Sequence, residues 1–200
     1  MTRIAAFAFL LLLGSNAPAH ATAIVGKAAP PIELRDSNGE KVRLDAFKGK
    51  LVVLEWVNFQ CPFVGKHYGS GHMQKLQKEY TEKGVVWLSV CSSAPGKQGY
   101  VTGSEANALE KEKGAAPSRF LLDPKGVVGK AYGAKTTPHM FVIDQQGRVI
   151  YNGAIDDKPS TKQADIATAH NYLVAAVDAA MSGKKVETAA TQPYGCSVKY

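Results

Sequence analysis

Two long apolar runs separated by a helix-like segment constrain this fold more than any other feature. They are LVVLEWV at 51–57 and GVVWLSV at 84–90, and Cys91 follows the second run. Continuous apolar, β-branched strands are typical of a parallel sheet that is covered on both faces. Between the runs, apolar residues at near-helical spacing predict a helix over 62–83, and its glycines predict a kink or a late start. The sequence therefore predicts a parallel β-α-β unit.

The flanking segments extend this unit into a mixed α/β sheet. Strands at 119–123, 139–144 and 148–153 and a hairpin at 31–44 are predicted from β-branched runs and turn residues. Helices are predicted at 104–114, with a serine N-cap, at 124–133, and at 165–181, with His170 on the apolar stripe. Strands joined by helices pair in parallel and hairpins add antiparallel strands, so we expect a mixed central sheet flanked by helices.

The first residues indicate the compartment. A short positive start, an apolar run over 4–14 and small residues up to Ala23 form the pattern of a secretory signal peptide. We expect this peptide to span 1–23, with cleavage after Ala21 or Ala23, and the protein to be periplasmic or secreted. The apolar run is too short to span a bilayer, so no stable membrane anchor is expected after cleavage.

The rest of the chain is predicted to be one domain with a tail. The segment 24–181 has the length of a single domain with a buried core. The segment 182–200 lacks periodicity and is predicted to be an extended C-terminal tail that carries Cys196. The net charge of +7 is spread over lysines interleaved with glutamates, without a basic-aromatic platform, so no nucleic-acid partner is expected.

Three cysteines, Cys61, Cys91 and Cys196, are the main candidates for chemistry. In an oxidising compartment an odd number leaves at least one thiol unpaired within the chain or paired with another molecule. Cys61 follows an apolar strand and precedes a helix that begins with Pro62, and helix N-termini favour the thiolate. We therefore predict that Cys61 is a reactive nucleophile toward disulfides or peroxides; the alternative is an inert, buried structural cysteine.

Cys91 and Cys196 are both candidates for the thiol that resolves Cys61. Cys91 ends the second strand, where adjacent parallel strands bring it to the same edge of the sheet as Cys61. A cysteine at such a strand end is more often a packed core residue. Cys196 lies in the tail and is free to approach Cys61 or another molecule, so we favour Cys196.

A second signal is Thr137-Pro138, directly before the strand at 139–144. Proline fits the first position of a strand, and the peptide bond before it is either cis or trans. A cis bond would turn the backbone of Thr137 toward the Cys61 end of the sheet.

Taken together and in order, these motifs resemble a known family. The segments are NFQCPFV, KAYGAKTTPHMFVID, GRVIYNGAIDD and GCSVKY. They resemble the peroxiredoxin-like branch of the redoxin family (alkyl hydroperoxide reductase/thiol-specific antioxidant type), over nearly the whole mature chain. The resemblance implies a thioredoxin-like fold, a cis Thr137-Pro138 bond and Cys61 as the nucleophile.

The departures from the family pattern shape the expected reaction. Val64 stands where thioredoxins have their second cysteine, and Asn58 and Leu54 replace the typical peroxiredoxin hydroxyl residue and proline. Pro138 occupies the position of the peroxiredoxin arginine, so the main donor for activating a peroxide oxygen is missing. Thiol–disulfide exchange needs only a thiolate, access and a partner thiol, and it survives these losses.

Glu55 lies inside the first apolar run, at a position that matches a buried acid of thioredoxins. A carboxylate there would have a raised pKa and could accept a proton from the resolving thiol. The alternative is an outward-facing glutamate or one paired with a lysine.

A non-catalytic copper- or thiol-binding module is the alternative from another functional class. Cu(I) prefers thiolates, but no two cysteines lie close together in the sequence. His67 and His72 are five residues apart, which is a poor spacing for one metal on a helix, while His139 could approach Cys61. We expect no metal and no cofactor.

The sequence therefore favours an exported thiol–disulfide oxidoreductase or peroxiredoxin-like antioxidant protein, with thiol, disulfide or hydroperoxide partners and an outside electron donor.

Overall fold

The computed structural model describes residues 23–200. The predicted signal peptide over 1–23 lies outside the described residues, apart from Ala23. None of the helices between residues 23 and 200 is long and apolar enough to cross a membrane.

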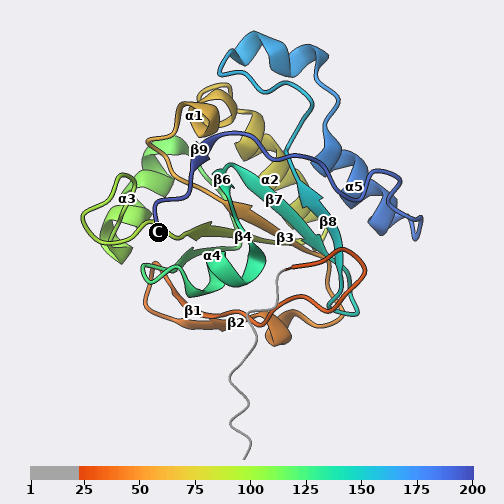
Figure 1. Ribbon diagram of the computed structural model, residues 1–200, viewed down its shortest axis with the longest axis horizontal. Helices are drawn as coiled ribbons and strands as arrows, with labels where there is room; N and C mark the ends of the chain where they lie inside the picture. Colours follow the sequence, from red (N-terminus) through yellow and green to blue (C-terminus); the bar gives the residue numbers. More distant parts are fainter. Residues whose placement is uncertain (1–22) are drawn as a thin grey trace, which may run out of the picture.

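A seven-stranded mixed sheet in the order β2-β1-β5-β4-β3-β7-β8 forms the centre of the molecule (Figure 1). Parallel pairing joins the three central strands β3 (Val52–Trp56), β4 (Val86–Cys91) and β5 (Arg119–Leu122). These are the continuous apolar runs of the sequence, and β3 and β4 are buried at every position. The predicted parallel β-α-β unit is therefore confirmed.

Antiparallel strands complete the sheet on both sides. β7 (His139–Ile143) pairs with β3 and forms a hairpin with β8 (Val149–Gly153). The N-terminal hairpin of β1 (Glu33–Asp36) and β2 (Lys41–Arg43) extends the other side by pairing with β5. Both hairpins were expected from their turn residues.

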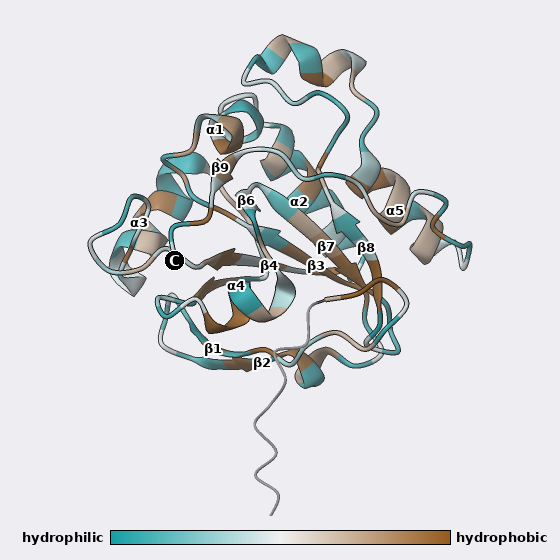
Figure 2. Ribbon diagram, viewed as in Figure 1, coloured by the Kyte–Doolittle hydropathy of each residue, from teal (hydrophilic) through white to brown (hydrophobic). Residues whose placement is uncertain are grey.

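Helices cover both faces of the sheet. One apolar core joins strand residues such as Val53 and Trp87 to residues of α1 (Pro62–Gly69), α2 (His72–Glu82), α3 (Gly103–Lys113) and α5 (Tyr172–Met181). The other core joins residues such as Leu54 and Leu88 to α4 (Val127–Tyr132) and to N-terminal residues. Figure 2 shows the hydrophobic colouring along the central strands between these two layers. The predicted mixed sheet with flanking helices is confirmed.

Three helix predictions need correction at their boundaries. The helix predicted over 62–83, with a kink or a late start expected from its glycines, is two helices, because Gly71 has a left-handed backbone (φ 76°) between α1 and α2. The N-cap of α3 is Thr102 rather than a serine, and it forms a reciprocal capping box with Glu105.

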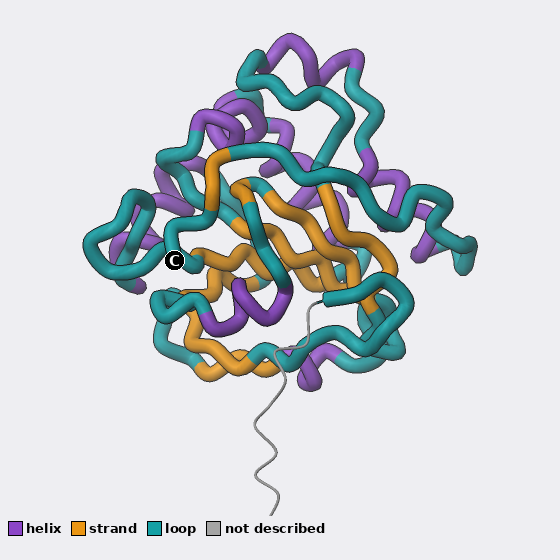
Figure 3. Tube along the Cα trace, in the orientation of Figure 1, coloured by secondary structure: helices purple, strands orange, loops and turns teal. Residues whose placement is uncertain are grey.

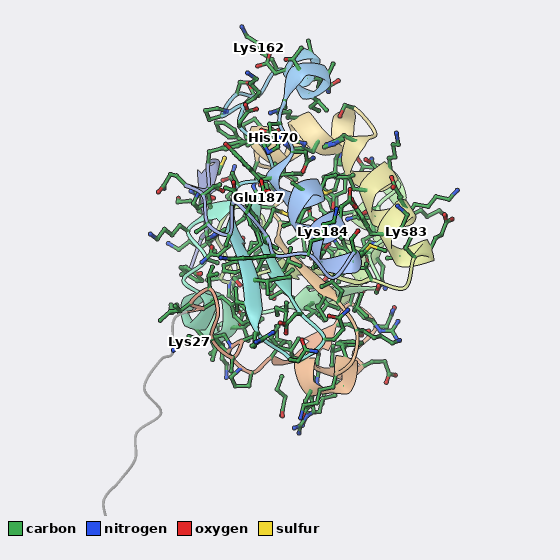
Figure 4. The ribbon with its side chains drawn as sticks, turned by 90° about the vertical axis from the view of Figure 1, so that its right-hand side faces the viewer. Lys27, Lys83, Lys162, His170, Lys184 and Glu187 are labelled. Atoms are coloured by element: carbon green, nitrogen blue, oxygen red, sulfur yellow. The ribbon has the colours of Figure 1, made fainter. Side chains whose placement is uncertain are left out.

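The helix predicted over 165–181 is also divided. A 3-10 helix, η2 (Gln163–Thr168), is followed by a break and then by α5, which Asn171 caps by accepting a hydrogen bond from Val174 N at 2.9 Å. Figure 4 shows His170 in this connection, and its side chain is exposed rather than buried in the core. The apolar spacing of the sequence continues across the break between η2 and α5, which is set by the Asn171 cap. A second 3-10 helix, η1 (Leu44–Phe47), follows β2.

The C-terminal tail is extended, as expected, but it is packed along the molecule. After α5 the chain crosses in front of the sheet as a long loop with one short strand (Figure 3). It pairs with β8 through hydrogen bonds of Asn152 with Ala189 and Thr191, each 3.1 Å long. Further on, β9 (Cys196–Ser197) pairs with β6 (Thr136–Thr137), the strand directly before Pro138. The tail therefore brings Cys196 to the loop that contains Thr137.

Candidate active site

The connection from β3 to α1 fixes the backbone of Cys61. The Cys61 N–H donates to the carbonyl of Asn58 at 2.9 Å, and the Asn58 side chain accepts from Gln60 N at 2.9 Å. Cys61 has an extended backbone (φ −83°, ψ 125°) and is the N-cap of α1, with Pro62 as the first helical residue. Its side chain therefore lies at the amino end of a helix, as the sequence predicted.

Two sulfur atoms meet at this point. Cys61 Sγ lies 2.7 Å from Cys196 Sγ and 3.0 Å from the Thr137 carbonyl oxygen. Cys61 is 1% exposed, whereas Cys196 is about half-buried. All three cysteines of the described chain are thiols in this structure. Cys61 and Cys196 are thus adjacent in space although 135 residues separate them.

Pairing of β6 with β9 produces this contact. Thr137 faces Cys196 and Thr136 faces Ser197 in the antiparallel register. The Thr137–Pro138 bond is cis, the isomer that the family resemblance implies. Gly195 lets the tail approach, because a Cβ at that position would collide with the Thr137 carbonyl oxygen.

The pair has asymmetric acidity. Burial raises the pKa of the Cys61 thiol, but hydrogen bonds from Cys196, the Val64 backbone and Thr137 lower it more, and the net shift is downward. Burial together with the neighbouring Cys61 raises the pKa of Cys196 to about 11. The arrangement therefore favours a Cys61 thiolate that accepts a hydrogen bond from the Cys196 thiol.

The Thr137 hydroxyl is available to donate to a Cys61 thiolate. Thr137 is 3% exposed, and its Oγ1 has no hydrogen-bond partner among the groups that the structure describes. A buried hydroxyl without a partner is costly, and a negative sulfur beside it would satisfy the O–H. Thr137, a candidate from the sequence, thus contributes both its carbonyl and its hydroxyl to the surroundings of Cys61.

Cys91 lies in a different environment. Its Sγ donates to the carbonyl of Gly99 at 3.3 Å, in the loop that follows β4. It is 4% exposed, and burial raises the pKa of its thiol. The structure therefore brings Cys196, and not Cys91, into hydrogen-bond contact with Cys61.

Glu55 is buried, but its contacts do not include a cysteine. Burial raises the pKa of its carboxyl group. The carboxylate accepts hydrogen bonds of 2.9 to 3.2 Å from four side chains, those of Tyr68, Gln77, Trp87 and Ser89. These donors cross-link β3 and β4 to α1 and α2, so in this state Glu55 organises the helical face of the sheet.

The histidines do not join the two thiols. His139 is fully engaged, because Nδ1 accepts from Lys135 N and Nε2 contacts Asn152 Oδ1. The break between α1 and α2 brings His67 and His72 together with their Nδ1 atoms 3.0 Å apart, a contact that their five-residue spacing on a helix did not indicate. Within residues 23–200 no group of three His, Cys, Asp or Glu side chains is arranged to hold a metal ion.

Sequence reasoning missed the groups that hold the tail. Lys66 and Asp156 form a buried ion pair of 3.1 Å, and both contact the Tyr194 hydroxyl. Nothing in the segment GAIDD around Asp156 indicates a partner, and Lys66 belongs to a helix on which lysines are ordinarily exposed. A tyrosine two residues before a tail cysteine was the only local signal.

Comparison with known proteins identifies the family of this chain. The sequence profile of the Redoxin family matches residues 24–171. The chain belongs to the Redoxin family. Thiol-disulfide oxidoreductase ResA of Bacillus thuringiensis subsp. konkukian is 29% identical over 126 residues, which cover 63% of this chain and 67% of that protein. Glutathione peroxidase-like peroxiredoxin 2 of Saccharomyces cerevisiae is 26% identical over 152 residues, which cover 68% of this chain and 92% of that protein.

Solved structures agree with this assignment. A hypothetical protein of Sinorhizobium meliloti superposes with a TM-score of 0.74 at 28% identity and covers 88% of this redoxin and 94% of its own chain. The thioredoxin domain of a thiol-disulfide oxidoreductase from Bacteroides vulgatus gives a TM-score of 0.52 at 19% identity, over 72% and 96% of the two chains. The fold is thioredoxin-like, and the protein is a thiol-dependent oxidoreductase of the redoxin class.

Proposed function

We propose that Cys61 and Cys196 form a redox-active pair that exchanges with disulfides of proteins or small molecules. The observation that carries this proposal is the 2.7 Å separation of the two sulfur atoms at the amino end of α1. The lowered pKa of Cys61 assigns it the role of nucleophile, and Cys196 takes the role of resolving thiol.

The reaction proceeds in two exchange steps. The Cys61 thiolate attacks one sulfur of a substrate disulfide, a mixed disulfide with Cys61 forms, and the other substrate sulfur leaves as a thiolate. Cys196 loses its proton and attacks Cys61 Sγ, which releases the second substrate thiolate and forms the intrachain disulfide. The substrate gains two electrons and two protons, and an outside thiol donor returns the Cys61–Cys196 bond to two thiols.

Glu55 is not required as a proton acceptor in this scheme. Its carboxylate already accepts from four side chains, and none of its hydrogen-bond partners is a thiol. We propose that Glu55 supports the position of α1, and therefore of Cys61, and that solvent takes the proton of the half-buried Cys196.

Reduction of hydroperoxides is the second candidate function, supported by the similarity to a peroxiredoxin of yeast. The Cys61 thiolate would attack the peroxide and form a sulfenic acid with release of an alcohol. Cys196 would then condense with the sulfenic acid and release water. Exchange is the better-supported reaction, because no arginine or lysine side chain of residues 23–200 hydrogen-bonds to Cys61.

Disulfide mapping tests the proposal. The reduced protein is treated with one equivalent of a disulfide oxidant, quenched with acid, digested and analysed by mass spectrometry. A Cys61–Cys196 bond is the expected product, and Cys91 is expected as a free thiol. A Cys61–Cys91 bond, or only mixed disulfides with the oxidant, would contradict the proposal.

Parallel assays separate the three candidate activities. Wild-type protein is expected to reduce a model disulfide with a thiol donor faster than it consumes hydrogen peroxide. The reverse order would favour the peroxidase. Stoichiometric Cu(I) binding that protects both thiols, without turnover in either assay, would favour a copper-binding module.

We also propose that the chain is exported, with the signal peptide at its amino end. Ala23 is 2% exposed, and its carbonyl accepts a hydrogen bond from Asn152 at 3.3 Å, so it packs as part of the domain. This favours cleavage after Ala21 over cleavage after Ala23. Amino-terminal sequencing of the protein from the exported fraction is expected to begin at Thr22. A first residue of Ile24 would move the cleavage site, and an intact Met1 would contradict export.

A further inference from the structure

A buried ion pair under the C-terminal tail has no role in the two exchange steps. Lys66 of α1 and Asp156, which follows β8, are 0% and 1% exposed, and their charged atoms lie 3.1 Å apart. Placing two charges in a protein interior is expensive unless further hydrogen bonds complete their shells. The Lys66–Asp156 ion pair is therefore expected to do more than stabilise the fold.

The ion pair is completed by the tail. Lys66 Nζ donates to Asp156, to the Lys158 carbonyl at 2.8 Å and to the Tyr194 hydroxyl at 3.3 Å. The Tyr194 hydroxyl in turn donates to Asp156 Oδ1, and Lys158 N donates to the same oxygen at 2.9 Å. Lys66 thus uses all three of its donors, and one of them holds the tail.

The neighbouring histidines add no charge to this site. His67 Nε2 lies 3.8 Å from Asp156 Oδ2, and burial lowers the pKa of His67 to about 3. His72 contacts His67, and burial lowers its pKa as well. The two histidines are therefore uncharged at neutral pH and add no third charge beside Lys66 and Asp156.

The position of Tyr194 links this site to the reacting sulfurs. Tyr194, Gly195 and Cys196 are consecutive, and the Tyr194 ring packs on the Phe63 ring at a centroid distance of 5.8 Å. Phe63 and Lys66 belong to the helix that Cys61 caps. Both sulfur atoms are therefore positioned by contacts with the same helix, α1.

Contacts on the other side of Cys196 are of a different kind. Val198 N donates to the Lys135 carbonyl at 3.0 Å, and the Tyr200 hydroxyl donates to the Ala134 carbonyl at 2.8 Å. These are ordinary hydrogen bonds to the backbone near β6. Only Tyr194 completes a buried charge, so the amino-terminal side of Cys196 carries the more specific anchor.

We infer that Lys66, Asp156 and Tyr194 form a tail clamp that positions Cys196 against Cys61 and sets the advantage of the resolving thiol over outside thiols. This rests on the proposed roles of Cys61 and Cys196. Tyr194 is a positioning residue, because it acts through the placement of Cys196 and does not touch the substrate. With the clamp in place, a mixed disulfide on Cys61 is resolved within the chain. Without it, outside thiols compete more effectively.

Competition with glutathione measures the clamp. The protein is equilibrated in redox buffers of reduced and oxidised glutathione, quenched with acid, and separated by mass spectrometry into intrachain disulfide and glutathione adduct on Cys61. Their ratio, multiplied by the concentration of reduced glutathione, gives the effective concentration of Cys196 at Cys61. Tyr194→Phe removes only the hydroxyl and is expected to lower this value about tenfold, the effect of one hydrogen bond to a charged group.

The matched control deletes the same chemical contact elsewhere. The Tyr80 hydroxyl donates to Asp178 at 2.9 Å, between α2 and α5. Tyr80→Phe therefore loses a tyrosine–aspartate hydrogen bond without touching the tail, and it is expected to leave the effective concentration unchanged. Urea unfolding of both variants shows that each is folded under the conditions of the assay.

The possible outcomes are distinguishable. An unchanged effective concentration in Tyr194→Phe, with a normal intrachain bond in wild type, would overturn the clamp and leave the proposed function intact. Equal losses in Tyr194→Phe and Tyr80→Phe would also overturn it, because general destabilisation would then explain the effect. A wild-type protein that forms only the glutathione adduct would overturn the proposed function itself. Tyr194→Leu, which removes ring and hydroxyl, is expected to lower the value further than Tyr194→Phe, and a value at the wild-type level would contradict the clamp.

Discussion

Cys61 follows the carboxyl end of β3, Cys91 is the last residue of the neighbouring parallel strand β4, and the two are almost equally buried, at 1% and 4% exposure. Yet the pKa of Cys61 is lowered and that of Cys91 is raised. Burial opposes ionisation at both positions. At Cys61 the Cys196 thiol, the Val64 backbone and Thr137 outweigh it, whereas the donors from Ser93 at Cys91 do not.

The contrast shows that reactivity at this edge of the sheet depends on donors, which come from three separate segments of the chain. The start of α1 supplies a backbone N–H, β6 supplies Thr137, and the tail supplies Cys196. As thiols, both cysteines donate to a backbone carbonyl, Cys61 to Thr137 at 3.0 Å and Cys91 to Gly99 at 3.3 Å, so this contact does not distinguish them. The pKa of a cysteine at this edge is lowered where a helix begins and the tail arrives, which supports the proposed role of Cys61.

Replacement of Cys61 by serine is expected to have the largest effect. Cys61→Ser is expected to lower the rate of model disulfide reduction at least about 1,000-fold, because the nucleophile is lost. Cys91→Ser is the matched control and is expected to keep the rate within about twofold. Both rates are measured with the same thiol donor at saturating concentration. A comparable loss in Cys91→Ser would mean that the second strand-end cysteine takes part in the reaction.

Gly195→Ala tests whether the tail is what makes Cys61 different. Gly195 has φ 141°, and an added Cβ would collide with the Thr137 carbonyl oxygen, so the variant must move β9 away from β6. We expect the intrachain disulfide to form at least about tenfold more slowly in stopped-flow oxidation, because Cys196 is displaced.

Gly147→Ala provides the control for backbone strain. Gly147 also has a positive φ, 79°, but no atom lies within 4 Å of an added Cβ in that hairpin turn. It is expected to lose some stability and to keep the wild-type rate of disulfide formation. Similar slowing in both glycine variants would assign the effect to strain instead of the tail contact.

The pH dependence of cysteine alkylation tests how much each hydrogen-bond donor lowers the pKa of Cys61. In reduced protein, iodoacetamide is expected to modify Cys61 with a midpoint below its ordinary pKa of 9.0, since the thiolate is the reactive form. Cys91 is expected to react only above 9.0, because its pKa is raised. Each cysteine is followed separately by mass spectrometry of its peptide.

Removal of a donor is expected to move the Cys61 midpoint upward. Cys196→Ala removes the largest of the lowering hydrogen bonds, and Thr137→Val removes a smaller one while keeping the side-chain shape. The expected order of midpoints is therefore wild type, Thr137→Val, Cys196→Ala, from lowest to highest. A wild-type midpoint above that of Cys196→Ala would contradict the assignment of Cys61 as the acidic member of the pair.

The smallest effect is expected for the structural cysteine. Cys91→Ala removes a buried sulfur and its hydrogen bond to Gly99, so we expect a loss of about 1 kcal/mol in the free energy of unfolding. Cys91→Ser keeps a donor for the Gly99 carbonyl and should lose less. Urea unfolding at fixed pH measures both, and a larger loss in Cys91→Ser would contradict the role of this hydrogen bond.

The sheet was predictable because its information is local. Continuous apolar runs defined β3 and β4, turn residues defined the hairpins, and the position of Cys61 between a strand and Pro62 indicated a helix start. The errors also had local causes. The glycines of 62–83 indicated an interruption there, but the apolar periodicity that spans Asn171 does not reveal that α5 begins anew at this residue.

The site was less predictable because it depends on pairing between distant segments. Nothing in the residues around Cys196 specifies that it lies opposite Thr137, since a two-residue strand has no pattern of its own. The contact of Lys66 with Asp156 joins residues 90 apart, and only the folded chain shows that both are buried. Strand-end packing favoured Cys196 over Cys91, but it did not indicate the β6–β9 pairing that places Cys196 beside Cys61.

The long separation of the paired cysteines links the oxidation state of the protein to its resistance to unfolding. A bond between residues 135 positions apart would cross-link most of the folded chain. Closing a loop of that size restricts the unfolded ensemble by about 5 kcal/mol in the chain-entropy description. By thermodynamic linkage, the native fold favours the oxidised pair by the same free energy, so each catalytic cycle would alternate between a more and a less durable form of the same domain.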